Sequence, residues 1–190
     1  MLDNGRMNVL AISGSLRAKS SNTAVLQAMA TLAPANAKMH LFDGIGDLPH
    51  FNPDHDKDGM TLPDAVSAFR SAVARADGLI LSSPEYAHGI PGSLKNALDW
   101  LVSSTDFASK PVMLLNISPI STHVHAQLIE VLKTMSAEVH SDAVYTFSMP
   151  RGRHDMQSML SDSDIAPALA HALYTFIAAI DQKRRAQISE

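Results

Sequence analysis

Cysteine is absent from this chain of 190 residues, so neither disulfides nor thiol chemistry are available to it. No apolar run approaches the about 18 residues that a membrane-spanning helix needs, and residues 1–6 lack the pattern of a signal peptide. Positive charge is also scarce, because 15 Lys and Arg stand against 19 Asp and Glu, for a net charge of −4. Nucleic-acid binding favours a basic surface. We therefore expect a cytoplasmic protein whose partners include neither a membrane nor a nucleic acid.

Apolar runs and helical patterns alternate along the chain. Five runs have the pattern of buried parallel strands, at residues 8–13, 38–43, 78–81, 110–118 and 138–145. Apolar residues at helical spacing follow each run: from residue 23, over 62–76, from 91, over 121–137 and over 164–185. Residues 44–60 and 149–163 are polar and irregular. The alternation predicts one α/β domain over residues 1–190, with a parallel sheet covered by helices on both faces.

A polar turn directly after the first predicted strand carries the clearest chemistry. It runs from Gly14 to Asn22 and opens a helix, where backbone N–H groups and the helix dipole face an anion. It contains four short neutral donors and one forked cation: Ser15, Ser20, Ser21, Asn22 and Arg17. A terminal phosphate monoester suits this set, because it offers many acceptors and nearly two negative charges. The alternative is an ordinary loop in which Ser20 or Ser21 caps the helix.

A second loop follows the third predicted strand. Residues 84–91 begin and end with proline, and they precede apolar residues at helical spacing. The segment therefore predicts a strand, a stiff loop and a helix in succession. In an open α/β sheet, ligands bind at the loops that follow the carboxyl ends of strands. Both loops are thus candidates for one binding site.

The two loops together resemble the signatures of the NADPH-dependent FMN reductase family. Gly14-Ser15-Leu16-Arg17, with Ser20 and Asn22, is similar to the phosphate loop of that family. Pro84-Glu85-Tyr86, followed by Gly-Ile-Pro-Gly at 89–92 and Leu-Lys-Asn-Ala-Leu-Asp-Trp at 94–100, is similar to its second signature. The resemblance covers residues 7–180. It implies a flavodoxin-like, doubly wound sheet of five parallel strands in the order 2-1-3-4-5, with FMN as cofactor.

The resemblance also implies where FMN binds. Its phosphate would be held by the first loop, at Ser15, Arg17, Ser20, Asn22 and Thr23, with Ser21 beside them. The polar edge of the isoalloxazine would lie along the second loop, at Pro84, Glu85, Tyr86, Ala87, His88 and Gly89. Ser118, after the fourth strand, would approach the other side of the flavin.

Two departures from the family pattern bear on flavin contacts and substrate access. Many members have Asn after the Tyr, whereas this chain has Ala87, so a side-chain contact to the flavin is lost or replaced by backbone. Many members also carry a glycine pair after the fourth strand, whereas residues 119–123 here read Pro-Ile-Ser-Thr-His. The resemblance therefore leaves access from that side open.

Two classes of function follow from these observations. One is an enzyme that takes hydride from NADPH or NADH onto FMN and reduces a flavin, a quinone or a similar small-molecule acceptor, in a ping-pong scheme. The other is a flavodoxin-like electron carrier without a substrate of its own. Arg17 at the phosphate and the modest acidity favour the enzyme. Because positioning dominates hydride transfer, no catalytic acid, base or nucleophile is predicted.

The donor and the quaternary structure are two further expectations. The 2′-phosphate of NADPH needs a cation, and four residues are candidates: Arg17, Lys19, Arg151 and Arg153. The resemblance implies a homodimer or homotetramer. We place the boundary at Tyr86 and the helix after it, because that helix carries apolar residues on more than one side.

Histidines and aromatic residues outside the signatures have ordinary structural interpretations. His123 and His125 could form a metal pair, but no carboxylate or cysteine cluster lies nearby in sequence, so no metal site is predicted. His88 lies beside the flavin or faces solvent. Trp100 and Tyr174 are expected in the core rather than at the cofactor.

Overall fold

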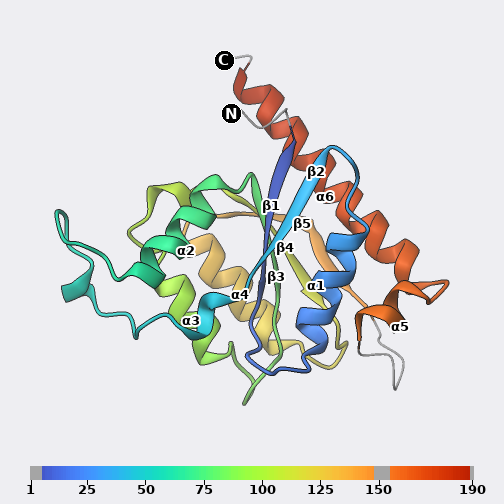
Figure 1. The fold of residues 1–190 in the computed structure, drawn as a ribbon, viewed down its shortest axis with the longest axis horizontal. Coiled ribbons are helices and arrows are strands. Elements are labelled where there is room, and N and C mark those ends of the chain that lie inside the picture. Colours follow the sequence, from blue (N-terminus) through green and yellow to red (C-terminus); the bar gives the residue numbers. More distant parts are fainter. Residues whose placement is uncertain (1–5, 148–154, 189–190) are drawn as a thin grey trace.

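The computed structural model describes residues 6–147 and 155–188. Its centre is one sheet of five strands in the order β2-β1-β3-β4-β5, and all four neighbouring pairs are parallel (Figure 1). The strands are β1 (Met7–Ser13), β2 (Ala37–Phe42), β3 (Gly78–Ser82), β4 (Pro111–Asn116) and β5 (Glu138–Thr146). The five predicted strands and the flavodoxin-like order 2-1-3-4-5 are therefore confirmed.

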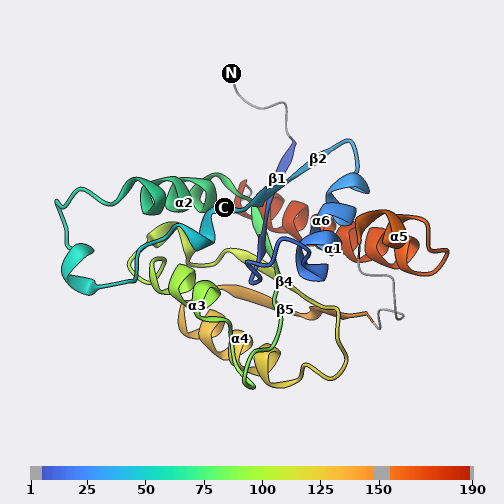
Figure 2. The same cartoon turned by 60° about the horizontal axis from the view of Figure 1, so that its bottom comes forward.

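Helices cover both faces of this sheet, as the alternation of elements predicts. One face carries α2 (Asp64–Arg75), α3 (Gly92–Asp99) and α4 (His123–Thr134), while the other carries α1 (Ser21–Thr31), α5 (Met156–Leu160) and α6 (Ile165–Ile188) (Figures 1 and 2). Each layer has its own apolar core against the sheet. The middle strand β3 is buried at all five positions, which explains why its sequence is a continuous apolar run rather than an alternating one.

The starts of α1 and α3 follow from their first residues. The Ser20 hydroxyl caps α1 by accepting a hydrogen bond of 3.3 Å from the Thr23 N–H. Pro91 precedes the first helical residue of α3, where its missing N–H costs nothing. These two helix starts place the polar turn 14–22 and the loop 84–91 at the same edge of the sheet, where β1 and β3 end.

Two sequence expectations about this architecture are wrong. The short helix α5 lies within the segment 149–163, which the sequence predicts to be irregular. Asp155 stabilises the start of this helix by accepting from the Ser158 N–H at 3.0 Å. Tyr174 is 51% exposed on α6 rather than part of the core. Trp100, in contrast, is fully buried as expected.

Trp100 anchors the long segment that connects β2 to α2. This segment contains two single turns of 3-10 helix, Gly44–Gly46 and Pro53–His55. The Trp100 indole N–H donates to the Pro49 carbonyl at 2.7 Å, and the ring packs edge-on against Phe51 with centroids 5.1 Å apart. Asn96 adds a hydrogen bond of 2.8 Å, accepted from the Phe51 N–H. The loop is thus fixed to α3 through side chains that the second family signature contains.

Candidate functional site

A cavity of about 480 Å³ lies at the carboxyl edge of the sheet, where the loops after β1, β3 and β4 converge. It has the position at which open α/β sheets bind ligands. Its walls are formed by Ser15, Arg17, Ser20, Ser21, Asn22, Ser83, Pro84, Glu85, Tyr86, Ile117, Ser118, Pro119, Ile120 and Ser121.

Close packing of two loops shapes the floor of this cavity. The Gly14 N–H donates to the Ser82 carbonyl at 2.8 Å, which holds the turn after β1 against the end of β3. A Cβ atom at Gly14 would lie 2.8 Å from Ser83 Oγ and 3.0 Å from Leu94 Cδ2, so a larger residue would have to displace these two side chains. Close packing therefore favours glycine here, and not an unusual backbone angle.

Three buried polar side chains in the turn after β1 keep an unused donor. Ser15, Ser20 and Asn22 are only 7–8% exposed. The two serine hydroxyls accept backbone hydrogen bonds from Arg17 and Thr23, and Asn22 Oδ1 accepts from the Ser82 hydroxyl at 2.9 Å. Within the described part of the chain, neither hydroxyl hydrogen nor the Asn22 amide N–H has an acceptor. Buried donors are seldom left in this state, so a ligand with several acceptors fits this wall.

Arg17 adds positive charge to the same wall. Its side chain is exposed at the cavity and, among the residues that the structure describes, it makes no ion pair. The N–H groups of Ser21 and Asn22, in the first turn of α1, likewise point from a helix N-terminus without an acceptor in the described ranges. A dianionic phosphate matches this combination of a forked cation and helix N–H groups. Ser20 also caps α1, so the capping interpretation is confirmed, and the cap leaves the Ser20 hydroxyl hydrogen available to a ligand.

The loop after β3 turns sharply at its tip. Tyr86 and Gly89 exchange two backbone hydrogen bonds, of 3.2 and 2.9 Å, and enclose Ala87 and His88. Both enclosed residues have positive φ, 48° for Ala87 and 57° for His88. Such a tight turn favours Asn or Gly at these positions. This conformation explains the Asn that many family members carry after the Tyr. Ala87 adopts the same positive φ only with backbone strain.

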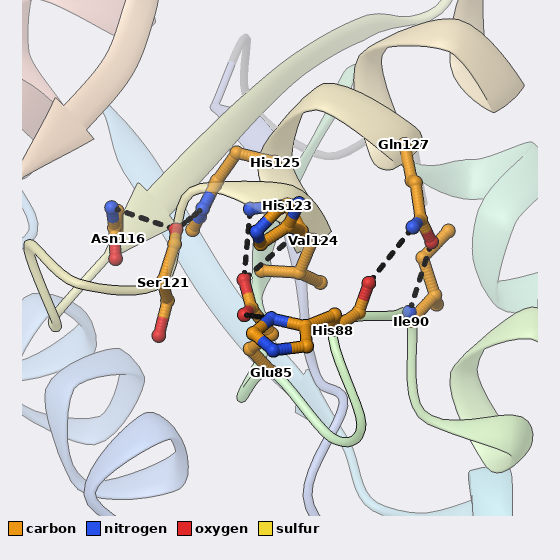
Figure 3. A network of polar contacts seen from close by, with 9 residues as sticks. All are labelled: Glu85, His88, Ile90, Asn116, Ser121, His123, Val124, His125 and Gln127. Atoms are coloured by element: carbon orange, nitrogen blue, oxygen red, sulfur yellow. Dashed lines mark hydrogen bonds and ion pairs between the residues drawn. The ribbon is translucent and has the colours of Figure 1, made fainter.

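Glu85 ties this loop to the N-terminus of α4 (Figure 3). Its Oε2 accepts from the N–H groups of His123 and Val124 at 2.9 and 3.1 Å, and its Oε1 lies 3.1 Å from His88 Nδ1. The hydrogen bond from Val124, more than those from His88 and His123, holds the pKa of Glu85 below its usual value. The carboxylate is thus ionised and fixed at the boundary between the cavity and the turn.

The loop after β4 forms the opposite wall. Asn116 Oδ1 accepts from the Ser118 N–H at 3.0 Å, and the Ser121 carbonyl receives a hydrogen bond from the Asn116 amide at 3.5 Å. His125 Nδ1 lies 2.9 Å from the same carbonyl. These contacts hold residues 117–121 in place even though the glycine pair of the family pattern is missing. Ile120, 86% exposed, projects at the mouth.

The cavity brings together nine of the thirteen residues predicted from the sequence: Ser15, Arg17, Ser20, Ser21, Asn22, Pro84, Glu85, Tyr86 and Ser118. Four lie outside its lining, namely Thr23, whose hydroxyl donates to Ser13 at 2.9 Å, and Ala87, His88 and Gly89 in the turn. Sequence reasoning missed Ser83, Ile117, Pro119, Ile120 and Ser121. Ser83 directly precedes the second signature, and the other four flank Ser118, so a wider window around each motif would have included them.

Comparison with known protein families adds evidence that is independent of the cavity. The sequence pattern of the NADPH-dependent FMN reductase family matches residues 7–150 of this chain. The chain belongs to this family. Membership confirms the resemblance that the two sequence motifs predict. The name of the family specifies FMN and NADPH, which agrees with a cavity wall that suits a phosphate group.

Several curated reductases are similar to parts of this family member. The chain is 42% identical over 94 residues to a 2-hydroxy-1,4-benzoquinone reductase of a Burkholderia species, covering 50% of this chain and 49% of that one. It is 35% identical over 111 residues to a quinone reductase of Escherichia coli, covering 57% and 58%. An NAD(P)H-dependent FMN reductase of Pseudomonas aeruginosa is 39% identical over 114 residues, covering 59% and 60%. The chain thus spans about half the length of the curated relatives it matches.

A solved structure shows the same fold over nearly the whole length of this chain. The flavoenzyme NAD(P)H:(acceptor) oxidoreductase of Paracoccus denitrificans superimposes with a TM-score of 0.78 over 93% of this chain and 98% of that chain. At 24% identity this likeness concerns the fold alone. No helix within residues 6–147 and 155–188 is long and apolar enough to cross a membrane.

Proposed function

We propose that this protein is an NAD(P)H-dependent, FMN-containing oxidoreductase that reduces flavins, quinones or similar small molecules. The observation that carries the proposal is the cavity at the ends of β1, β3 and β4, with buried donors and Arg17 on one wall and apolar residues at its mouth. Family membership and the names of the curated relatives support the same activity.

The residues of the cavity suit FMN at both of its ends. Ser15, Ser20, Asn22 and Arg17 would hold the phosphate, with the free N–H groups of the first turn of α1. Residues 84–86 and 117–118 would line the ring system from two sides. When bound, FMN supplies the redox chemistry by accepting a hydride from the donor and passing two electrons to the acceptor. The chain itself binds and orients the reactants.

We infer that the donor and the acceptor use the same opening in turn. The three loops occupy the other sides of the cavity, and the exposed apolar side chains of Tyr86 and Ile120 form a rim at its mouth. Such a rim provides apolar contact for one planar ring at a time. Steady-state kinetics with the donor and a quinone varied together should therefore give the parallel lines of a ping-pong scheme.

The choice between NADPH and NADH would depend on cations beside the mouth. Lys19 lies on the turn after β1, is exposed and stays outside the cavity lining, so it is available to a 2′-phosphate, whereas Arg17 would already hold the FMN phosphate. Arg151 and Arg153, the other two candidates, lie outside the described residues. We propose NADPH as the preferred donor on the basis of Lys19.

We also propose a homodimer or homotetramer with its boundary near Tyr86. The sequence argument for this boundary is wrong in one respect: Leu94, Ala97, Leu98, Trp100 and Leu101 are all buried in the core, and Val102 alone of the predicted apolar set is exposed. The exposed rim of Tyr86 and Ile120 supports the boundary instead, because a partner chain would cover it. The single domain over 1–190 and the cytoplasmic location remain predictions.

A turnover assay with the purified protein alone tests the proposed activity. Flavin-loaded protein is mixed with NADPH and a benzoquinone, and NADPH oxidation is followed over many enzyme equivalents. Continuous oxidation that depends on both reactants is expected. An electron carrier of the same fold would need a separate reductase to receive electrons from NADPH, so the purified protein alone would not sustain NADPH oxidation, and that result would replace the enzyme by the carrier.

A further inference from the structure

Three potential metal ligands meet beside the cavity, where the turn after β3 contacts the N-terminus of α4. They are Glu85, His88 and His123 (Figure 3). Glu85 and His88 come from the loop between β3 and α3, whereas His123 is the first residue of α4. The cluster therefore joins two segments that are 35 or more residues apart, and no sequence motif announces it.

The distances within the cluster suit a small cation. One carboxylate oxygen and one ring nitrogen of each histidine all lie within 4.8 Å of one another. Tetrahedral zinc sites have Zn–N bonds of about 2.0–2.1 Å, which places neighbouring ligand atoms roughly 3.3 Å apart. Glu85 Oε1 and His88 Nδ1 are already 3.1 Å apart. The rings of His88 and His123 meet edge to face with centroids 4.6 Å apart, and both are exposed, so small side-chain rotations complete the geometry.

The carboxylate of this cluster is held in place from behind. Glu85 Oε2 accepts from two backbone N–H groups of α4, while Oε1 lies 3.1 Å from His88 Nδ1. Metal-binding carboxylates are commonly oriented by hydrogen bonds of this kind from groups outside the site. The Glu85 side chain is 11% exposed and that of His88 is 78% exposed. One ligand is thus rigid and partly buried, and the solvent side of the cluster stays open.

The neighbouring histidine does not belong to this set. His125 is buried, and its Nδ1 lies 2.9 Å from the Ser121 carbonyl. The two histidines that lie close together in the sequence therefore differ in position: His123 belongs to the cluster, and His125 contacts the Ser121 carbonyl. The carboxylate that seemed to be missing near His123 is supplied by Glu85 from another loop.

We propose that Glu85, His88 and His123 form a binding site for one zinc(II) ion, with a water molecule as the fourth ligand on the solvent side. Two imidazoles and one carboxylate are a ligand set that zinc accepts in tetrahedral sites with one open position. Bound zinc would connect the turn at Tyr86–Gly89 to α4. Because Glu85 also lines the cavity, the ion would stiffen one wall of the proposed flavin site.

Isothermal titration calorimetry with zinc chloride tests this site. The flavin-loaded, tag-free protein is stripped with a chelator and titrated in a buffer that does not bind zinc. One zinc ion per chain is expected, and His88→Ala and His123→Ala should each weaken binding at least tenfold, since even the loss of a partner outside a metal site costs about 10- to 100-fold. Glu85→Gln, which keeps the acceptor for the α4 N–H groups, should also weaken binding.

His171→Ala is the matched control, because this exposed histidine lies on α6 at the opposite face of the sheet. It should bind zinc like the unmodified protein. Absence of stoichiometric binding by the unmodified protein would overturn the proposal, and so would binding that survives both His88→Ala and His123→Ala. Circular dichroism and thermal unfolding establish that each variant is folded. The heat of zinc binding requires no turnover, so its outcome is independent of the proposed oxidoreductase activity.

Discussion

At the residue scale, the turn after β3 shows the physical consequence of one departure from the common pattern of the family. Ala87 and His88 both adopt the left-handed region, with φ of 48° and 57°. Left-handed backbone costs an L-residue with a Cβ roughly 1–2 kcal/mol, and Asn tolerates it better than Ala. Many members have Asn where this chain has Ala87. Gln127 holds the turn in this conformation, because its side-chain N–H donates to the His88 carbonyl and its Oε1 accepts from the Ile90 N–H.

Ala87→Asn should therefore stabilise the protein. We expect the free energy of unfolding in urea to rise by about 0.5–1 kcal/mol, as part of the left-handed cost is relieved. Ala87→Val is the matched control and should lower stability, because a β-branched residue fits positive φ poorly. If Asn lowers stability as Val does, the strain argument for this turn is wrong.

The residues that the sequence predicts for the site line one cavity where they follow a strand directly. Ser15, Arg17 and Asn22 are near neighbours in the chain, so one helix start brings them to one wall. Contacts between loops are different, because spacing along the chain does not encode them. The approach of Glu85 to His123, and the pairing of the Thr23 hydroxyl with Ser13, are consequences of how the loops pack.

At the scale of elements, the strands were the easiest to predict, since a parallel sheet covered on both faces needs continuous apolar runs. The failures have equally physical causes. Helix α5 has five residues in a polar context and depends on its Asp155 cap, so it lacks a periodic signal. The apolar residues of α3 and its end looked divided between two faces. The connection from β2 to α2 folds over them and buries them, which no helical pattern could indicate.

Trp100→Phe should release that connection without unfolding the sheet. It removes the indole hydrogen bond to the Pro49 carbonyl and part of the contact with Phe51. The Pro49 carbonyl keeps a hydrogen bond of 3.0 Å from the Asn96 amide, so we expect the free energy of unfolding to fall by about 0.5–1.5 kcal/mol, the net contribution of one hydrogen bond. Hydrogen exchange should accelerate at residues 47–56 first. Tyr174→Phe, an aromatic change at an exposed position, should alter stability by less than about 0.5 kcal/mol.

At the scale of the whole molecule, the fold places one cavity, one apolar rim and one histidine cluster at the same edge of the sheet. If this rim is the boundary between subunits, Tyr86→Asp should separate them and weaken FMN binding together. Tyr174→Asp is a closely matched control, because Tyr174 is 51% exposed and Tyr86 is 49% exposed. It should leave the assembly intact.

Sedimentation velocity at micromolar concentration measures this outcome. The unmodified protein should sediment as a dimer or tetramer and the Tyr86→Asp variant as a smaller species. A single species near 20.4 kDa for the unmodified protein would end the oligomer proposal. A Tyr86→Asp variant that stays associated and retains its flavin would place the boundary elsewhere.

The central claim is that the cavity holds FMN with its phosphate at Arg17, and paired titrations with FMN and riboflavin test it most directly. Arg17→Ala removes a charged hydrogen-bonding partner worth about 1.5–3 kcal/mol, so FMN affinity should fall roughly 10- to 100-fold while riboflavin affinity stays nearly unchanged. Lys19→Ala, a neighbouring exposed cation outside the cavity lining, should affect neither ligand strongly. Equal losses of FMN and riboflavin affinity in Arg17→Ala would contradict the assignment.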